Sequence, residues 1–172
     1  MRDEPAGLRE FVVARSAALM RTAVLLTGDR HNAEDLLQGA LLKAWRNWDT
    51  VQAADQPELY VRRILINDFV GGRRRLWIGE RPVADPPEML GDDPALVAVV
   101  DREALRQALR ELSPGQRAAV VCRYYDDMSE SQTAALLHVA PGTVKSQAAK
   151  GLARLRQLVD DPATATGSSH GS

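Results

Sequence analysis

Apolar residues recur along most of the chain at intervals of three and four positions, the spacing of a helix with one buried face. No segment of useful length alternates apolar and polar residues as a half-buried strand does. The pattern therefore predicts an all-α protein. In the N-terminal half it indicates helices over about residues 8–26, 32–46 and 58–75, with a polar loop from Asn47 to Pro57 before the third helix.

The second of these helices has a candidate start and a well-defined apolar stripe. Asn32 can serve as its N-cap, because a short polar side chain accepts a hydrogen bond from the free backbone N–H groups of the first turn. Its apolar positions are Leu36, Leu37, Ala40, Leu41, Ala44 and Trp45. We expect Trp45 to lie in the core with the apolar face that it extends.

The composition changes between Pro82 and Pro94, a stretch with four prolines, a glycine and several carboxylates but little to bury. We interpret this stretch as part of a flexible acidic linker between two small helical domains. The predicted boundaries are a first domain at 1–78, a linker at 79–100, a second domain at 101–160 and a disordered tail at 161–172. The tail is too small and polar to pack.

The second domain carries clear helix-start signals. Ser113 and Ser129 are each followed three residues later by glutamine, which is the pattern of a capping box. Two short helices, about Glu130 to Leu137 and Pro141 to Val159, are joined by roughly three residues. This spacing predicts a helix-turn-helix, a motif that places its second helix in the major groove of DNA.

The second helix of this motif separates its side chains by chemistry. At about 100° per residue, an apolar stripe that includes Val144 and Leu155 lies opposite a polar and cationic face. No carboxylate lies between Val139 and Val159, where Lys145, Lys150, Arg154 and Arg156 give a charge of +4. A solvated face normally mixes both signs, so a face that binds DNA phosphates is the better explanation.

Charge and composition narrow the class of protein. The net charge is −1, but a basic stretch from Tyr60 to Pro82 is followed by the acidic linker and then by the basic helix. The single cysteine, Cys122, excludes an internal disulfide and suits a reducing cytosol. No stretch approaches the ~20 apolar residues of a membrane span, and no signal peptide is apparent. We therefore expect a cytoplasmic protein without membrane insertion.

Several segments resemble the extracytoplasmic-function (group IV) sigma factors, the small two-domain subunits of bacterial RNA polymerase in the sigma-70 family. Residues 112–155, with GTVKS at 142–146 and the ARLR that closes at Arg156, resemble region 4 of this family. Residues 32–46, NAEDLLQGALLKAWR, resemble the helix of regions 2.1 to 2.2. The segments YVRRILIN, at residues 60–67, and KSQ, at residues 145–147, resemble the corresponding sequences of the actinobacterial SigE-type subfamily. The resemblance implies a non-enzymatic protein, without cofactor or metal, that directs promoter-specific transcription initiation.

The resemblance also implies which residues meet each partner. Region 2.2 docks on the β′ clamp helices of the polymerase core, which assigns Asp35, Leu36, Gln38, Leu41 and Leu42 to that surface. Regions 2.3 and 2.4 read the minus-10 element as unpaired bases, which assigns Tyr60, Arg62, Arg63, Asn67, Arg73, Arg74 and Arg75. Region 4.2 reads the minus-35 element, which assigns Thr143, Lys145, Ser146, Gln147, Lys150 and Arg154. The polymerase β flap and an anti-sigma protein are further candidate partners.

Within the minus-35 set, Gln147 is the side chain able to hydrogen-bond an adenine edge bidentately, so we expect it to carry sequence information. Lys150 and Arg154 are expected mainly to add affinity. Two positions depart from the family pattern: His138 takes a turn position where glycine is common, and Ala140 stands where a capping serine is usual. Loss of that cap costs about 1 kcal/mol, which Pro141 at the first helical position partly offsets.

Three other classes of protein are alternatives. A helix-turn-helix regulator that acts without core polymerase needs a sensing or dimerising domain, which the first 75 residues do not obviously supply. An all-helical enzyme lacks support, because the sequence has no paired metal ligands, glycine-rich phosphate loop or nucleophile beside a base. A helical adaptor that binds only protein leaves both basic stretches without a role, and a salt-sensitive shift of DNA would distinguish it.

Overall fold

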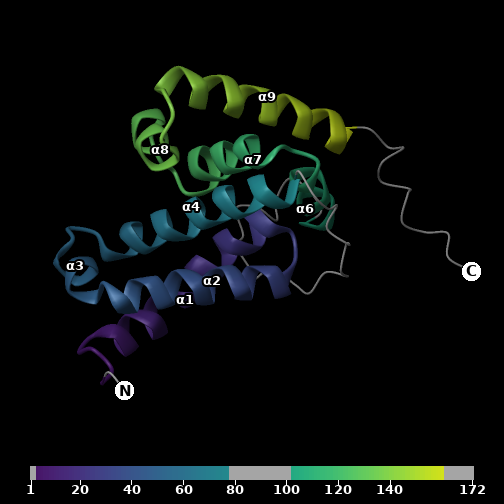
Figure 1. Cartoon of the computed structure of the whole chain (residues 1–172). Helices are drawn as coiled ribbons and strands as arrows, with labels where there is room; N and C mark the ends of the chain where they lie inside the picture. Colours follow the sequence, from purple (N-terminus) through teal and green to yellow (C-terminus); the bar gives the residue numbers. More distant parts are fainter. Residues whose placement is uncertain (1–2, 78–101, 161–172) are drawn as a thin grey trace, which may run out of the picture. The chain divides into compact units, whose positions relative to one another are not determined.

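The computed structural model describes residues 3–77 and 102–160, and the described residues are organised as helices without strands (Figure 1). The chain divides into two compact units, Met1–Asp85 and Pro86–Ser172. The expected all-α class and the expectation of two helical regions are both confirmed. The predicted linker and tail lie outside the described residues, so their boundaries stay predictions.

Within residues 3–77, the first unit forms α1 (Leu8–Thr27), α2 (Arg30–Arg46), α3 (Trp48–Ala53) and α4 (Pro57–Trp77). The long helices α1, α2 and α4 pack against one another, and the short α3 packs against α2 and α4. The fully buried side chains at the centre include Leu19, Leu26, Val51, Val61, Leu65 and Ile66. A salt bridge of 2.5 Å from Lys43 Nζ to Asp68 Oδ1 links α2 to α4 near the surface.

The start of α2 differs from the prediction. Asp29, not Asn32, is the N-cap: its Oδ1 accepts a hydrogen bond from the Asn32 backbone N–H at 3.0 Å, and its Oδ2 accepts from the Asn32 side chain. The reason lies in the preceding turn. Gly28 ends α1 in the left-handed conformation, with φ 82°, and its N–H bonds to the carbonyl of Val24 at 2.7 Å. The chain thereby reaches a capping conformation one residue later, at Asp29.

The predicted loop from Asn47 to Pro57 was wrong over most of its length, because Trp48–Ala53 forms α3. Six residues make less than two turns, too few for a periodic pattern to show. Trp48 and Val51 lie one turn apart and point inward, with exposed fractions of 5% and 0%. Trp45, which we expected in the core, is instead 37% exposed. The buried tryptophan is thus the one that faces inward from α3.

The second unit contains α6 (Arg102–Arg110), α7 (Pro114–Val120), the π-helical turn η1 (Val121–Tyr125), α8 (Glu130–Leu137) and α9 (Pro141–Asp160). Helix α9 packs against α6, α7 and α8. Both predicted capping boxes are confirmed, at the starts of α7 and α8. The helices predicted at 130–137 and 141–159 are confirmed with the same starts.

Two features fix how α7 sits in this unit. The buried guanidinium of Arg117 donates from Nη2 to the carbonyls of Arg110, at 2.8 Å, and Leu112, at 3.2 Å, so it satisfies the open end of α6. Gly151 of α9 lies against α7, where a side chain would not fit: a Cβ added there would stand 2.7 Å from Val120 Cγ2. The backbones of α7 and α9 therefore approach more closely than two ordinary side chains allow.

Candidate nucleic-acid interface

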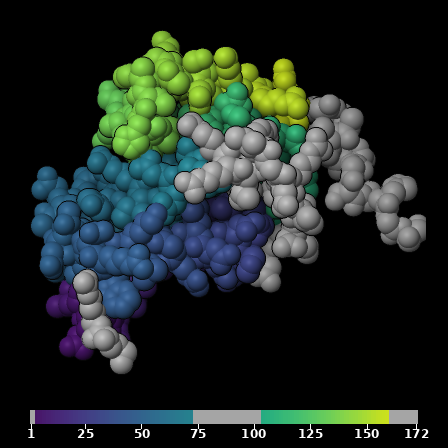
Figure 2. Space-filling model, in the orientation of Figure 1, coloured from purple at the N-terminus to yellow at the C-terminus, as the bar shows by residue number. Residues whose placement is uncertain are grey.

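The turn between α8 and α9 has the form of a helix-turn-helix. Ser129 starts α8 by accepting a hydrogen bond from the Gln132 N–H at 3.0 Å, while its own N–H donates to Gln132 Oε1 at 2.9 Å. His138 ends α8 in the left-handed region, with φ 58° and ψ 43°. Val139, whose N–H bonds to Ala134 O at 3.1 Å, is exposed and leads through Ala140 into Pro141. Figure 2 shows the side chains of α8 and α9 side by side on one surface of their unit.

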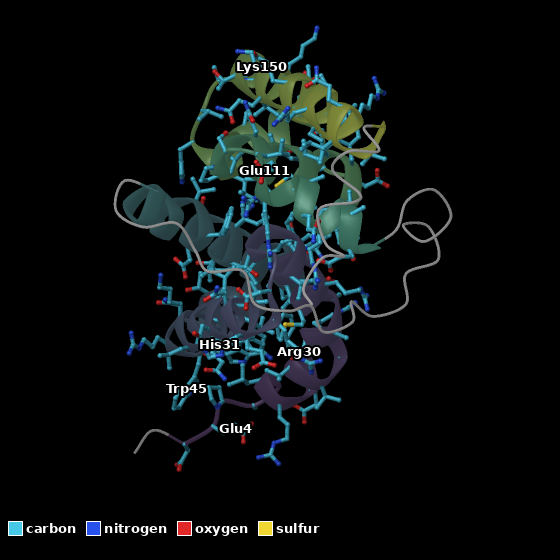
Figure 3. The ribbon with its side chains drawn as sticks, turned by 90° about the vertical axis from the view of Figure 1, so that its right-hand side faces the viewer. Glu4, Arg30, His31, Trp45, Glu111 and Lys150 are labelled. Carbon is cyan, nitrogen blue, oxygen red and sulfur yellow. The ribbon has the colours of Figure 1, made fainter. Side chains whose placement is uncertain are left out.

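Helix α9 presents one apolar and one polar face, as the sequence predicts. Val144, Ala148 and Leu155 are buried, with exposed fractions of 1%, 4% and 7%. The exposed positions include Lys145, Ser146, Ala149, Lys150, Ala153, Arg154, Arg156 and Gln157. Figure 3 shows the Lys150 side chain extending away from the helices. This outer face has small residues between its cations, so little hinders a close approach by a phosphate backbone.

Gln147 has a different setting from the cations around it. Its side chain is half-buried and lies against the first turn of α7, where Oε1 would be 2.5 Å from a Cβ added to Gly115. The bare backbone of Gly115 therefore leaves the space that the Gln147 amide occupies. Sequence patterns could not predict this contact, because the two residues are 32 positions apart in the chain. They come together only because α7 packs against α9.

In the first unit, the outer face of α4 carries three of the residues predicted for the minus-10 element. Tyr60, Arg63 and Asn67 follow one another at i, i+3 and i+7, with Arg63 exposed and the other two half-exposed. Arg73, Arg74 and Arg75 lie on the last turns of α4, and their side chains are outside the described part of the structure.

Arg62 lies apart from this face. Its side chain is 17% exposed and forms an ion pair of 2.8 Å with Glu58, which also pairs with Arg15 of α1 at 3.3 Å. The guanidinium thus belongs to an ionic link between α1 and α4. Its predicted contact with phosphate requires the pair with Glu58 to break, a demand that the exposed Arg63 does not face.

Helix α2 turns a mixed polar and apolar face outward. Asp35, Gln38 and Leu42 are exposed, Leu36 and Leu41 are half-buried, and the core face consists of Leu37, Ala40 and Ala44. Leu42 is 43% exposed and Trp45 follows it one turn later on the outside of the helix (Figure 3). Both side chains are large and apolar, and both lie on the outer side of α2. Trp45 is the residue that sequence reasoning placed in the core.

Other kinds of site find no support in the described part of the chain. Among residues 3–77 and 102–160, no group of three or more His, Cys, Asp or Glu side chains could hold a metal ion. In the same residues, no helix has both the length and the apolar character needed to cross a membrane. Cys122 is buried within η1.

Comparisons with known proteins match both units in order. Sigma-70 region 2 matches residues 11–77, and Sigma-70, region 4 matches residues 102–155. The chain is 39% identical over 148 residues to the RNA polymerase sigma-E factor of Streptomyces coelicolor, covering 86% of this chain and 83% of that protein. It is 32% identical over 163 residues to the ECF RNA polymerase sigma factor SigL of Mycobacterium tuberculosis, covering 92% of each.

A solved structure agrees with the sequence relatives. The sigma factor RpoE of Bartonella quintana, determined in complex with the anti-sigma factor NepR, superposes with a TM-score of 0.69 at 27% identity, over 88% of this chain and 96% of that one. The fold, the order of the two regions and relatives aligned over most of their length lead to one conclusion. The chain belongs to the extracytoplasmic-function sigma factors of the sigma-70 family and acts as a sigma factor of RNA polymerase.

Proposed function

We propose that this sigma factor reads the minus-35 element with the outer face of α9 and the minus-10 element with α4 and the segment before it. The observation that carries the proposal is the outer face of α9, where exposed cations stand on a helix without a carboxylate from Pro141 to Val159. Such a helix fits the major groove of a duplex, and its cations can neutralise phosphates on both sides.

Within α9 the roles divide by chemistry. Lys145, Lys150 and Arg154 contact phosphates, Thr143 and Ser146 add hydrogen bonds at the first turns, and Gln147 reads a base edge. In the bound state the Gln147 amide either moves away from Gly115 to reach the base, or contacts the base while it still lies against Gly115. Either way its contribution depends on the sequence of the promoter, whereas that of Lys150 does not.

The side chains of the first unit also have distinct roles in binding DNA. On α4, Tyr60 is placed to stack on an unpaired base, Asn67 to bond a base edge, and Arg63 to neutralise a phosphate. Arg73, Arg74 and Arg75 extend the cationic sequence at the end of the helix. Arg62, which pairs with Glu58, supports the position of α4 more than it supplies a free cation.

The outer face of α2 binds the polymerase core at the β′ clamp helices through Asp35, Gln38 and Leu42, and Trp45 extends that face. The second unit meets the β flap. The NepR complex of the Bartonella relative supports an anti-sigma protein as a further partner. The protein catalyses no reaction itself and works in the cytoplasm, where the polymerase and the chromosome are.

Run-off transcription with actinobacterial core polymerase tests the proposal. Core polymerase with this protein is expected to initiate from promoter fragments that neither component transcribes alone. The matched variants Gln147→Ala and Lys150→Ala then separate the roles on α9. Gln147→Ala changes the preferred bases in the minus-35 element, whereas Lys150→Ala weakens initiation equally on all sequences. DNA binding that needs no core polymerase would favour a simple regulator, and identical effects of both variants would contradict the assigned roles.

A further inference from the structure

The residues before α1 form a turn that is fastened to α3. The Leu8 N–H bonds to Pro5 O at 3.3 Å, and Gly7 takes a left-handed conformation with φ 86°. The indole Nε1 of Trp48, the first residue of α3, donates to the carbonyl oxygen of Ala6 at 2.8 Å. This bond joins residues 42 positions apart, so the N-terminal turn and α3 hold one another in place.

Packing reinforces the hydrogen bond. Trp48 is 5% exposed, and its ring meets that of Phe11 edge-on, with centroids 5.5 Å apart and planes inclined at 62°. A side chain at Gly7 would crowd the same place, because a Cβ there would lie 3.2 Å from Gln52 Nε2 and 3.8 Å from Trp48 Cζ2. Both the backbone angle and the available space therefore favour glycine at this position.

Helix α3 depends on such tertiary contacts for its position. It has six residues, too few to be stable as an isolated helix. Its N-cap residue, Asn47, makes no capping hydrogen bond with its side chain. The buried residues of α3 are Trp48 and Val51. Of these two, only Trp48 has a polar side-chain group, the indole N–H, which can bond a neighbouring segment and so fix the direction of the helix.

The outer side of the same segment carries polar side chains without a single cation. Its exposed residues from position 47 to 56 include Asn47, Asp49, Thr50, Gln52, Asp55 and Gln56. Such groups donate and accept hydrogen bonds but do not attract phosphates, and two of them repel phosphates. They suit the polar edges of unpaired bases, while the cations of the adjacent α4 suit the backbone.

We propose that Trp48 is a positioning residue for reading the unpaired minus-10 bases. Its bond to the Ala6 carbonyl holds α3, and with it the polar groups at 47–56, at a fixed place beside the outer face of α4. The N-terminal turn therefore contributes to the reading of DNA by positioning α3, although the turn itself does not contact the DNA. The inference rests on the proposed function of the first unit and adds a determinant outside the helix that meets the DNA.

The decisive variant is Trp48→Phe, which keeps an aromatic ring against Phe11 and removes the N–H donor. Full-length protein is bound to core polymerase, and single-stranded DNA decamers are selected from a random pool by the wild-type complex. The measured quantity is selectivity, the ratio of the dissociation constants for a scrambled and a selected decamer. We expect Trp48→Phe to lower selectivity by about fivefold, the effect of one hydrogen bond, with affinity for core polymerase unchanged.

Two further variants sharpen the test. Gly7→Ala disturbs the Ala6 carbonyl from the other side and is expected to lower selectivity to a similar extent. The double variant is expected to lose no more than either single one, because both act on the same bond. Arg9→Gln is the matched control: it removes the exposed 2.7 Å ion pair with Glu4 from the same turn, a pair that raises the pKa of Arg9, and leaves Trp48 untouched.

The outcomes are distinguishable. Lower selectivity with unchanged core affinity, in Trp48→Phe and Gly7→Ala but not in Arg9→Gln, supports the inference. Unchanged selectivity in Trp48→Phe overturns it. So does a parallel loss of selectivity, core affinity and thermal stability, because Trp48 would then be an ordinary core residue. If the wild-type complex selects no motif at all, the proposed reading of the minus-10 element is wrong and the inference falls with it.

Discussion

The close approach of α7 and α9 makes Gly151→Ala a quantitative test of the second unit. The added methyl group would lie 2.7 Å from Val120 Cγ2, 3.4 Å from Gln116 O and 3.5 Å from Leu112 Cδ1. Carbon atoms in contact prefer about 3.5–4.0 Å, so the first distance is about 1 Å too short. Alanine gains about 1 kcal/mol over glycine in a helix interior. Overpacking a core costs about 1–3 kcal/mol, and we expect it to exceed that gain.

The expected result for Gly151→Ala is a net loss of about 1 kcal/mol in the free energy of unfolding. For a domain of 60–100 residues this lowers the melting temperature by roughly 4–8 °C. Urea and thermal unfolding of the full chain, followed by circular dichroism, measure it. Gly142→Ala is the matched control in the same helix, since nothing lies within 4 Å of its added Cβ, and it should be neutral or slightly stabilising. If Gly151→Ala stabilises the protein as much as the control does, the close contact between α7 and α9 is refuted.

Three more changes probe other parts of the structure. His138→Gly should raise the free energy of unfolding by about 0.5–1 kcal/mol, because glycine adopts the left-handed turn at φ 58° without steric cost; urea unfolding that shows a loss would contradict this. Asp29→Ala should lower it by about 1 kcal/mol through loss of the α2 cap, while Asn32→Ala, at the position that sequence favoured, should cost less. Lys150→Ala should reduce the salt dependence of promoter binding by about 0.9 in the slope of log K against log salt; an unchanged slope would exclude a phosphate contact.

The sequence was sufficient to predict the features that local residue patterns determine. The starts of α7 and α8 follow from serine and glutamine three residues apart, and the buried face of α9 follows from its apolar period. The surface of α9 was predictable for the same reason, since a helix with one buried stripe must expose the rest. These features depend on residues that are neighbours in the chain.

The failures all involve choices that only packing decides. Trp45 and Trp48 are similar in sequence context, but α2 turns Trp45 outward. Trp48 finds a carbonyl acceptor, Ala6 O, in the turn before α1 and an aromatic partner, Phe11, in the first turn of α1. Asn32 has the chemistry of a cap, but Gly28 ends α1 early enough for Asp29 to take that role. The contact of the Gln147 side chain with Gly115 likewise arises only because α7 and α9 pack together at that point.

The distribution of charge explains how a chain with a net charge of −1 can bind DNA, which is a polyanion. Helix α9 carries four cations and no carboxylate from Pro141 to Val159, and three arginines follow one another at 73–75 near the end of α4, while the exposed side chains at 47–56 carry only neutral or negative groups. Four cations on α9 are too few for tight binding of duplex DNA at physiological salt, because each neutralised phosphate adds an increment that salt weakens. Two such weak surfaces become effective when one partner holds both at the spacing of the promoter, since the second contact is then intramolecular. We therefore expect polymerase binding, through the exposed face of α2, to be the step that converts general attraction into promoter choice.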